Sequence, residues 1–230
     1  MSRPAALMSP PVSRLRGSRR CLTPLLLVVT LGVIGCGEAP APGPADGEDA
    51  MARTVPTGLS SEQEVFWERL EELCGQAFVG SPIEAPSDSN WWEAELVMHV
   101  RECGDDEIRI PLHVDDDRSR TWVVSRTDAG LRLKHDHRLE DGTPDAENTD
   151  YGGDTTGPGS IWRQEFPADA YSVSEVPGRE SQLWFLEIRP GEVFSYGLRR
   201  EATGLRYRVD FDLTAPVDPP PAPWGFEDEG

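Results

Sequence analysis

Two histidines stand two residues apart in the segment Leu131-Arg-Leu-Lys-His-Asp-His-Arg138. Alternate side chains of an extended strand share a face, so His135 and His137 follow Leu131 and Leu133 toward the buried side. If that side lines a barrel, the two imidazoles lie near one mouth of its interior, close enough to share a metal ion such as zinc. The alternative is a strand that leaves the core, with both histidines hydrogen-bonded at its rim.

The sequence names no third ligand for such a metal. Neither His99 nor His113 is near the pair along the chain, and alternation turns His113 to the face opposite Ile108. The spacing of the carboxylates that follow the pair does not match a cupin metal site. Gly-x-Ser-x-Gly, Cys-x-x-Cys and His-Glu-x-x-His motifs are also missing from the sequence, which argues against the common hydrolases and zinc enzymes.

The loop from 140 to 154 gathers carboxylates among residues that turn readily: Glu140, Asp141, Asp145, Glu147, Asp150 and Asp154. Clustered carboxylate oxygens suit a hard cation, which makes calcium the alternative metal. The loop lacks the alternating acids and fixed glycine of an EF-hand. Gly152, Gly153, Gly157 and Gly159 do not predict phosphate binding, because no lysine follows them and aspartates surround them.

The first 35 residues have the pattern of an export signal. An apolar run from Leu25 to Ile34, too short to span a bilayer, follows a basic segment without acidic residues: Arg3, Arg14, Arg16, Arg19 and Arg20. The segment Val33-Ile-Gly-Cys36 resembles the lipobox of bacterial lipoproteins. This resemblance implies cleavage before Cys36 and a lipid anchor on its thiol. Gly37 implies export to the outer membrane in a bacterium with two membranes.

Two cysteines remain once the leader with Cys21 is removed and Cys36 carries lipid. In an exported protein, Cys74 and Cys103 are then the natural disulfide pair, with two buried free thiols as the alternative. Closing a loop of this size contributes about 3 to 4 kcal/mol to stability. A catalytic cysteine is not expected, because no histidine stands beside either residue in a recognisable arrangement.

Charge excludes several classes of partner. Without the five leader arginines, 17 basic residues face 41 acidic ones, a net charge of −24. Such a surface repels nucleic acid and anionic lipid, so we expect membrane attachment through acyl chains alone. Residues 36–58 read as a flexible, acidic tether rich in proline and glycine, and residues 218–230 as a disordered tail, although Trp224 and Phe226 could dock.

Residues 59–217 read as one β-rich domain. It opens with a helix whose cap is Ser60 or Ser61 and whose end is Gly75. Alternating segments joined by tight turns then predict an antiparallel meander of strands. These segments are 76–83, 94–103, 107–114, 119–127, 131–137, 161–166, 182–189, 193–200 and 205–213.

A meander of this length exposes its edges unless it closes, so the sequence favours a barrel, with a β-sandwich as the alternative. The helix before the first strand is similar to the arrangement in lipocalin-like barrels. The segment from Phe66 to Val217 also resembles a family of uncharacterised exported bacterial proteins. The stretches that carry the resemblance are Met98-His-Val-Arg-Glu-Cys103, Ile108-Arg-Ile-Pro-Leu-His-Val114, Arg118-Ser-Arg-Thr-Trp122, Gly130-Leu-Arg-Leu-Lys-His-Asp-His-Arg138 and Tyr151-Gly-Gly-Asp-Thr155. That family implies no activity or ligand residue.

Three roles follow from these patterns. The favoured one is a membrane-anchored lipoprotein that binds a small apolar molecule in its barrel or an envelope protein. The alternatives are a metal-dependent enzyme built on His135 and His137, and a structural envelope protein without a ligand. The adjacent Trp91 and Trp92 cannot both face inward on a strand, so one of them is a candidate for a ligand-facing surface.

Overall fold

The computed structural model describes residues 58–175 and 178–228. The leader, Cys36 and the tether up to residue 57 lie outside the described residues. Among the described residues, no helix has the length and apolar content needed to cross a membrane. The elements are α1 (Ser61–Glu71), β1 (Ala77–Glu84), η1 (Asn90–Trp92), β2 (Leu96–His99), β3 (Glu102–Cys103), β4 (Glu107–Val114), β5 (Asp117–Thr127), β6 (Gly130–His137), β7 (Gly152–Asp154), β8 (Arg163–Pro167), α2 (Ala170–Glu175), η2 (Arg179–Ser181), β9 (Gln182–Arg189), β10 (Val193–Arg200) and β11 (Leu205–Val217).

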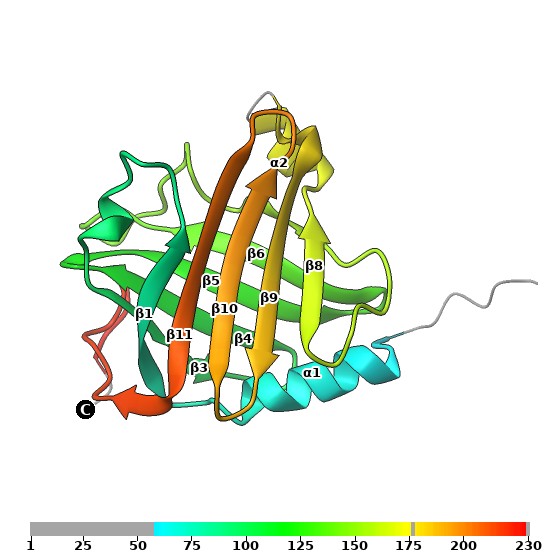
Figure 1. Ribbon diagram of the computed structural model, residues 1–230, viewed down its shortest axis with the longest axis horizontal. Coiled ribbons are helices and arrows are strands. Elements are labelled where there is room, and N and C mark those ends of the chain that lie inside the picture. The colour runs from blue at the N-terminus through cyan, green and yellow to red at the C-terminus, as the bar shows by residue number, and fades with distance from the viewer. Residues whose placement is uncertain (1–57, 176–177, 229–230) are drawn as a thin grey trace, which may run out of the picture. The chain divides into compact units, whose positions relative to one another are not determined.

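The strands form one 11-stranded antiparallel sheet that curls into a nearly closed barrel. Its path runs β7-β6-β5-β4-β2-β1-β11-β10-β9-β8, with β3 paired to β4. Because β1 pairs with β11, the first and last strands meet, and the open seam falls between β7 and β8. Strands β8 to β11 cross in front of β4 to β6 in Figure 1. The predicted mainly β meander is therefore confirmed, and the barrel forms rather than the sandwich.

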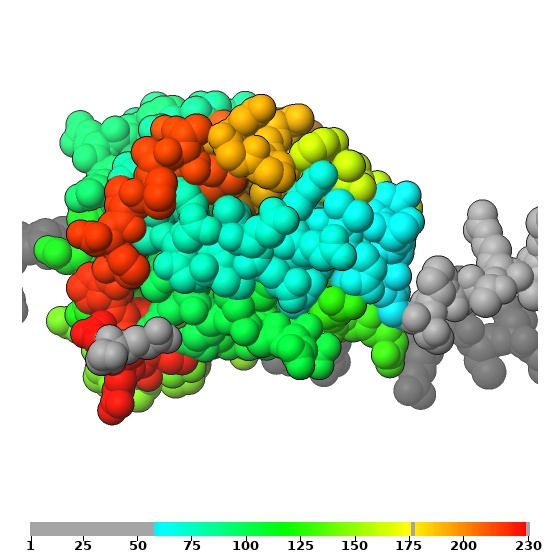
Figure 2. All heavy atoms as spheres, turned by 90° about the horizontal axis from the view of Figure 1, so that it is seen from below, coloured from blue at the N-terminus to red at the C-terminus, as the bar shows by residue number. Residues whose placement is uncertain are grey.

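Helix α1 begins at a capping box. The Ser60 hydroxyl accepts from the Gln63 amide, and the Gln63 side chain accepts from the Ser60 amide, so two otherwise unpaired donors are satisfied. Phe66, Trp67 and Leu70 lie on one face and are almost fully buried. This face closes one end of the barrel, and Figure 2 shows the helix lying across that end.

Large apolar side chains fill most of the barrel interior. The core is aromatic in its centre, where Trp122, Trp184, Phe194 and Phe211 have at most 2% of their surface exposed. Trp122 stacks on Tyr196 with ring centroids 4.2 Å apart, and Phe194 meets Phe211 edge-on at 6.1 Å. Such pairs stabilise a core by about 0.5–1.5 kcal/mol beyond their area burial. The interior is thus a packed core at the α1 end rather than a continuous cavity.

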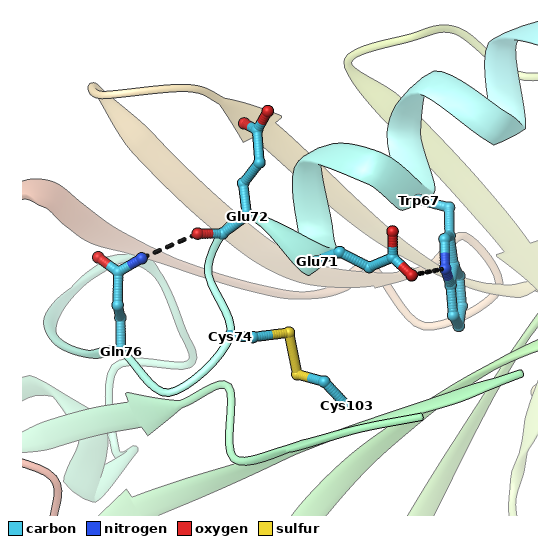
Figure 3. Close-up of a disulfide and its surroundings, with 6 residues drawn as sticks. All are labelled: Trp67, Glu71, Glu72, Cys74, Gln76 and Cys103. Atoms are coloured by element: carbon cyan, nitrogen blue, oxygen red, sulfur yellow. Dashed lines mark hydrogen bonds between the residues drawn. A yellow bond between two sulfur atoms is a disulfide. The ribbon is translucent and has the colours of Figure 1, made fainter. Parts of the chain in front are cut away.

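Cys74 and Cys103 form a disulfide, as predicted, that ties the end of α1 to β3 (Figure 3). The chain turns at Gly75, whose φ of +77° lies in the left-handed region that favours glycine. Around the bridge, the Trp67 indole donates to Glu71 at 2.7 Å and the Gln76 amide donates to the Glu72 carbonyl at 2.9 Å. The bridge therefore holds the helix over the end of the barrel that it closes.

The seam between β7 and β8 is closed by a few backbone contacts. The Asp169 amide donates to the Gly152 carbonyl at 3.0 Å, and the Ser172 hydroxyl bonds both backbone groups of Gly152. A Cβ at Gly153 would lie 1.7 Å from the carbonyl oxygen of Pro167. The two glycines therefore allow the strand edges to approach. The sequence predicted no strand here, because a Gly-Gly-Asp segment carries no alternation.

The C-terminal segment differs from its prediction. We expected a disordered tail over 218–230, with docking of Trp224 and Phe226 as the alternative, and its described part, through residue 228, does dock against the outside of the barrel. The Trp224 amide donates to the Arg118 carbonyl at 3.2 Å, and the Arg118 side chain bonds the Ala222 carbonyl at 3.2 Å. Phe226 packs beneath the guanidinium group of Arg138, 4.7 Å from the ring centroid. The contacts of Trp224 and Phe226 therefore hold in place a segment whose proline-rich, acidic composition predicted disorder.

Replacing Gly153 with alanine tests the seam. The added Cβ cannot fit against the Pro167 carbonyl, so we expect a loss of about 2 kcal/mol in the free energy of unfolding and a melting temperature lower by about 4–8 °C. Gly157→Ala is the matched control, because nothing lies within 4 Å of the position that its added Cβ would take. Equal melting temperatures for the two variants in thermal denaturation would contradict this account of closure.

Candidate functional site

A pocket of about 280 Å³ opens at the barrel end away from α1. Its walls are rich in aromatic rings: Trp91, Trp122, Tyr151, Tyr196 and Tyr207. Arg120, His135 and His137 are among its polar lining residues, together with Ser89 and Asn90. Small-molecule sites occupy about 300–1,000 Å³, so the pocket suits a compact ligand.

Hairpin register brings the polar residues together. Strands β5 and β6 pair so that Arg120 lies opposite His137 and Trp122 opposite His135. Directly paired residues of antiparallel strands share a face, so all four side chains point into the barrel. The turn at Asp128–Gly130 fixes this register.

His135 is held by two hydrogen bonds inside the barrel. Its Nδ1 lies 3.2 Å from the Tyr151 carbonyl oxygen, and its Nε2 lies 2.9 Å from the Tyr196 hydroxyl. A carbonyl can only accept, so Nδ1 carries the proton and Nε2 accepts from the Tyr196 hydroxyl. The ring also stacks on Tyr151 with centroids 4.4 Å apart. The pair of hydrogen bonds fixes the tautomer of His135 and joins β6 to β10 across the interior.

His137 lies nearer the mouth and bonds the loop that follows β6. Its Nδ1 lies 3.2 Å from the amide nitrogen of Asn148, and its Nε2 lies 3.0 Å from the Tyr151 hydroxyl. With the amide donating to Nδ1, Nε2 donates to the Tyr151 oxygen. The hydroxyl proton of Tyr151 then remains available to an acceptor in the pocket.

Burial keeps the pocket groups neutral at pH 7. It lowers the pKa of His135 to about 3 and that of His137 to about 4. Burial also raises the pKa of Tyr151 to about 12 and that of Tyr196 well above its usual range. The site therefore offers neutral hydrogen-bonding groups around one charged side chain, Arg120.

The geometry of the two histidines supports hydrogen bonding rather than metal coordination. The sequence predicted that His135 and His137 share one mouth of the barrel, and both do line this pocket. All four ring nitrogens already have polar neighbours, which a zinc ion would have to displace. Within residues 58–175 and 178–228, no group of three or more His, Cys, Asp or Glu side chains could hold a metal ion.

The carboxylates proposed for calcium serve local contacts. Asp141 accepts from the backbone and hydroxyl of Thr143, and Asp145 accepts from the Glu147 amide at 3.2 Å. Asp154 pairs with Arg132 at 2.6 Å. These side chains therefore cap turns and hold a neighbouring strand.

Sequence reasoning missed Arg120, Trp122, Tyr151 and Tyr196 as site residues. The first two could have been found, because a hairpin turning at Asp128–Gly130 sets Arg120 and Trp122 opposite the two histidines. Tyr151 is placed by the pairing of β6 with β7, where the His135 amide donates to its carbonyl at 2.9 Å, and the curvature of the sheet brings Tyr196 from β10 to the same pocket. Trp91 is the member of the Trp91–Trp92 pair that lines it, while Trp92 is 45% exposed.

The chain matches no family model, no curated protein and no solved structure.

Acidification tests the buried state of His135. The folded protein keeps this ring neutral well below the ordinary pKa of 6.5, whereas the unfolded chain takes up the proton. The contribution of the neutral His135 ring to the free energy of unfolding is therefore fully present above pH 6.5. It is lost as the pH falls toward 3, with a slope of at most about 1.4 kcal/mol per pH unit.

We expect His135→Gln to flatten this dependence between pH 6.5 and 4 when denaturant unfolding is measured across the range. The slopes of the variant and the unaltered protein above pH 7, where the imidazole is neutral in both states, provide the control. An unchanged slope in the acidic window would show that His135 is not held neutral by burial.

Proposed function

We propose that the protein is an exported lipoprotein that binds a small molecule in the pocket at the mouth of its barrel. The observation that carries this proposal is a pocket of about 280 Å³ at the end of a barrel whose remaining interior is packed. The ligand site that we propose is therefore at the mouth of the barrel, whereas the sequence favoured a ligand in the barrel interior.

The walls of the pocket are held in place before any ligand arrives. Trp122 stacks on Tyr196, the Tyr196 hydroxyl bonds His135, and the Tyr151 hydroxyl bonds His137. A site whose side chains are already ordered loses less conformational entropy when it binds. This preorganisation favours binding over a purely structural role for the aromatic cluster.

Filling the pocket should abolish binding. In the Leu198→Trp variant, a larger side chain occupies the space beside Tyr196 and Tyr207. We expect 2-naphthol to quench the tryptophan fluorescence of the unaltered protein with 1:1 saturation, and at least a tenfold weaker effect in the variant.

Arg199→Trp is the matched control, because Arg199 is the next residue along β10 and does not line the pocket. Its ion pairs with Glu165 and Glu201 are partly exposed and contribute little to stability. Equal quenching in the Leu198→Trp and Arg199→Trp variants would refute binding at this pocket.

The lipid anchor is tested at Cys36. Expression in a bacterium fed an alkyne-tagged fatty acid should label the protein, and Cys36→Ala should remove the label and release the protein from the membrane fraction. Cys21→Ala is the control, because the proposed cleavage discards Cys21 with the leader. Labelling that persists without Cys36 would contradict the proposed anchor.

A further inference from the structure

The pocket is free of carboxylates although the protein is strongly acidic. The chain carries 41 acidic residues against 22 basic ones, yet no aspartate or glutamate is among the described residues that line the pocket. One arginine, Arg120, does line it. An anionic group in the pocket would therefore meet the Arg120 cation at the wall, and Asp117, which pairs with Arg120, is not among the lining residues.

Arg120 retains donors for a ligand. Its Nη1 donates to the Asp117 carboxylate, and in the described part of the chain Nε and Nη2 have no protein acceptor. Burial has the largest effect on the pKa of His137 and of Tyr151, and the positive charge of Arg120 also acts on both groups, lowering each pKa. The Arg120 charge therefore acts on two groups of the pocket, and Asp145, Asp117 and Asp136 act on His137 in the opposite direction. A guanidinium group with free N–H donors is the side chain best suited to a planar oxyanion.

A second cation lies behind Tyr151. The Arg179 guanidinium carbon is 4.8 Å from the centroid of the Tyr151 ring, and its buried Nε has no hydrogen-bond partner among the described residues. The neutral Tyr151 hydroxyl, whose proton is not needed by His137, adds an uncharged donor beside these two cations. Arg120 and Tyr151 therefore supply hydrogen-bond donors at the wall, and the Arg179 cation lies behind Tyr151.

The apolar walls favour a flat ligand. Trp91 meets Tyr207 edge-on with centroids 5.1 Å apart, and the stacked pair of Trp122 and Tyr196 forms a second aromatic surface. Aromatic rings pack best against other planar rings in stacked or edge-on geometry. A cavity of about 280 Å³ leaves room for a bicyclic compound but not for a drug-sized one.

From this arrangement we propose that the pocket binds a planar aromatic monoanion, with its carboxylate at Arg120 and its rings against the aromatic walls. This inference rests on the proposed binding function and adds the chemical class of the ligand. The hydroxyl of Tyr151 supplies a further hydrogen bond to the same carboxylate.

Two probes of nearly the same shape, one anionic and one neutral, separate the effect of ligand charge from the effect of ligand shape. Isothermal titration calorimetry of the full-length protein with 2-naphthoate and 2-naphthamide should show a preference of about tenfold or more for the carboxylate. Arg120→Gln should remove the preference by weakening 2-naphthoate binding, while Arg120→Lys should retain part of it. Arg132→Gln removes the same charge from an exposed position paired with Asp154 and should leave the preference unchanged.

The outcomes distinguish this inference from the function on which it rests. Equal binding of the two probes, unaffected by Arg120→Gln, would overturn the anionic ligand and leave the pocket as a binding site. Failure of both probes to bind the unaltered protein would count against the proposed function itself. A preference lost equally in Arg132→Gln would show that overall charge, rather than Arg120, selects the carboxylate.

Discussion

The hydrogen bond from the Tyr196 hydroxyl to His135 is the contact on which the rest of this barrel depends. It spans 2.9 Å across the interior and joins β10 to β6, strands that lie on different sides of the open seam. On one side of it, tryptophan and phenylalanine rings fill the core down to α1. On the other side the pocket begins. The same bond therefore completes the core and forms the floor of the site.

This position explains why two histidines lie on an apolar face. A buried imidazole is tolerated when both nitrogens have partners, and the carbonyl of Tyr151 and the hydroxyl of Tyr196 satisfy those of His135. Keeping the ring neutral costs stability only at acidic pH, where protonation favours the unfolded chain. The pair thus serves as a polar layer between a dry core and an open mouth, and Arg120 remains the charged group available to a ligand.

Much of the fold was predictable from local pattern. The bounds of β4, β9 and β10 follow from alternation between tight turns, and the start of α1 follows from the pairing of Ser60 with Gln63. Alternation also placed the histidines at a mouth of the barrel. Strand β7 was not predicted, because its glycines allow a close backbone approach that alternation does not reveal. Docking of Phe226 was an alternative for the tail, but its partner Arg138 is distant in sequence and could not be named. The pocket was not predicted, because the curvature of the sheet brings together residues that are far apart in sequence.

The central claim is that a small planar anion enters the mouth pocket. It is tested most directly by the indole N–H resonances of the seven tryptophans in a ¹⁵N-labelled sample titrated with 2-naphthoate. The account predicts saturable shifts for Trp91 and Trp122, which line the pocket, with Trp67 and Trp162 unmoved. Shifts confined to the exposed Trp162, or no shift at any indole, would contradict it.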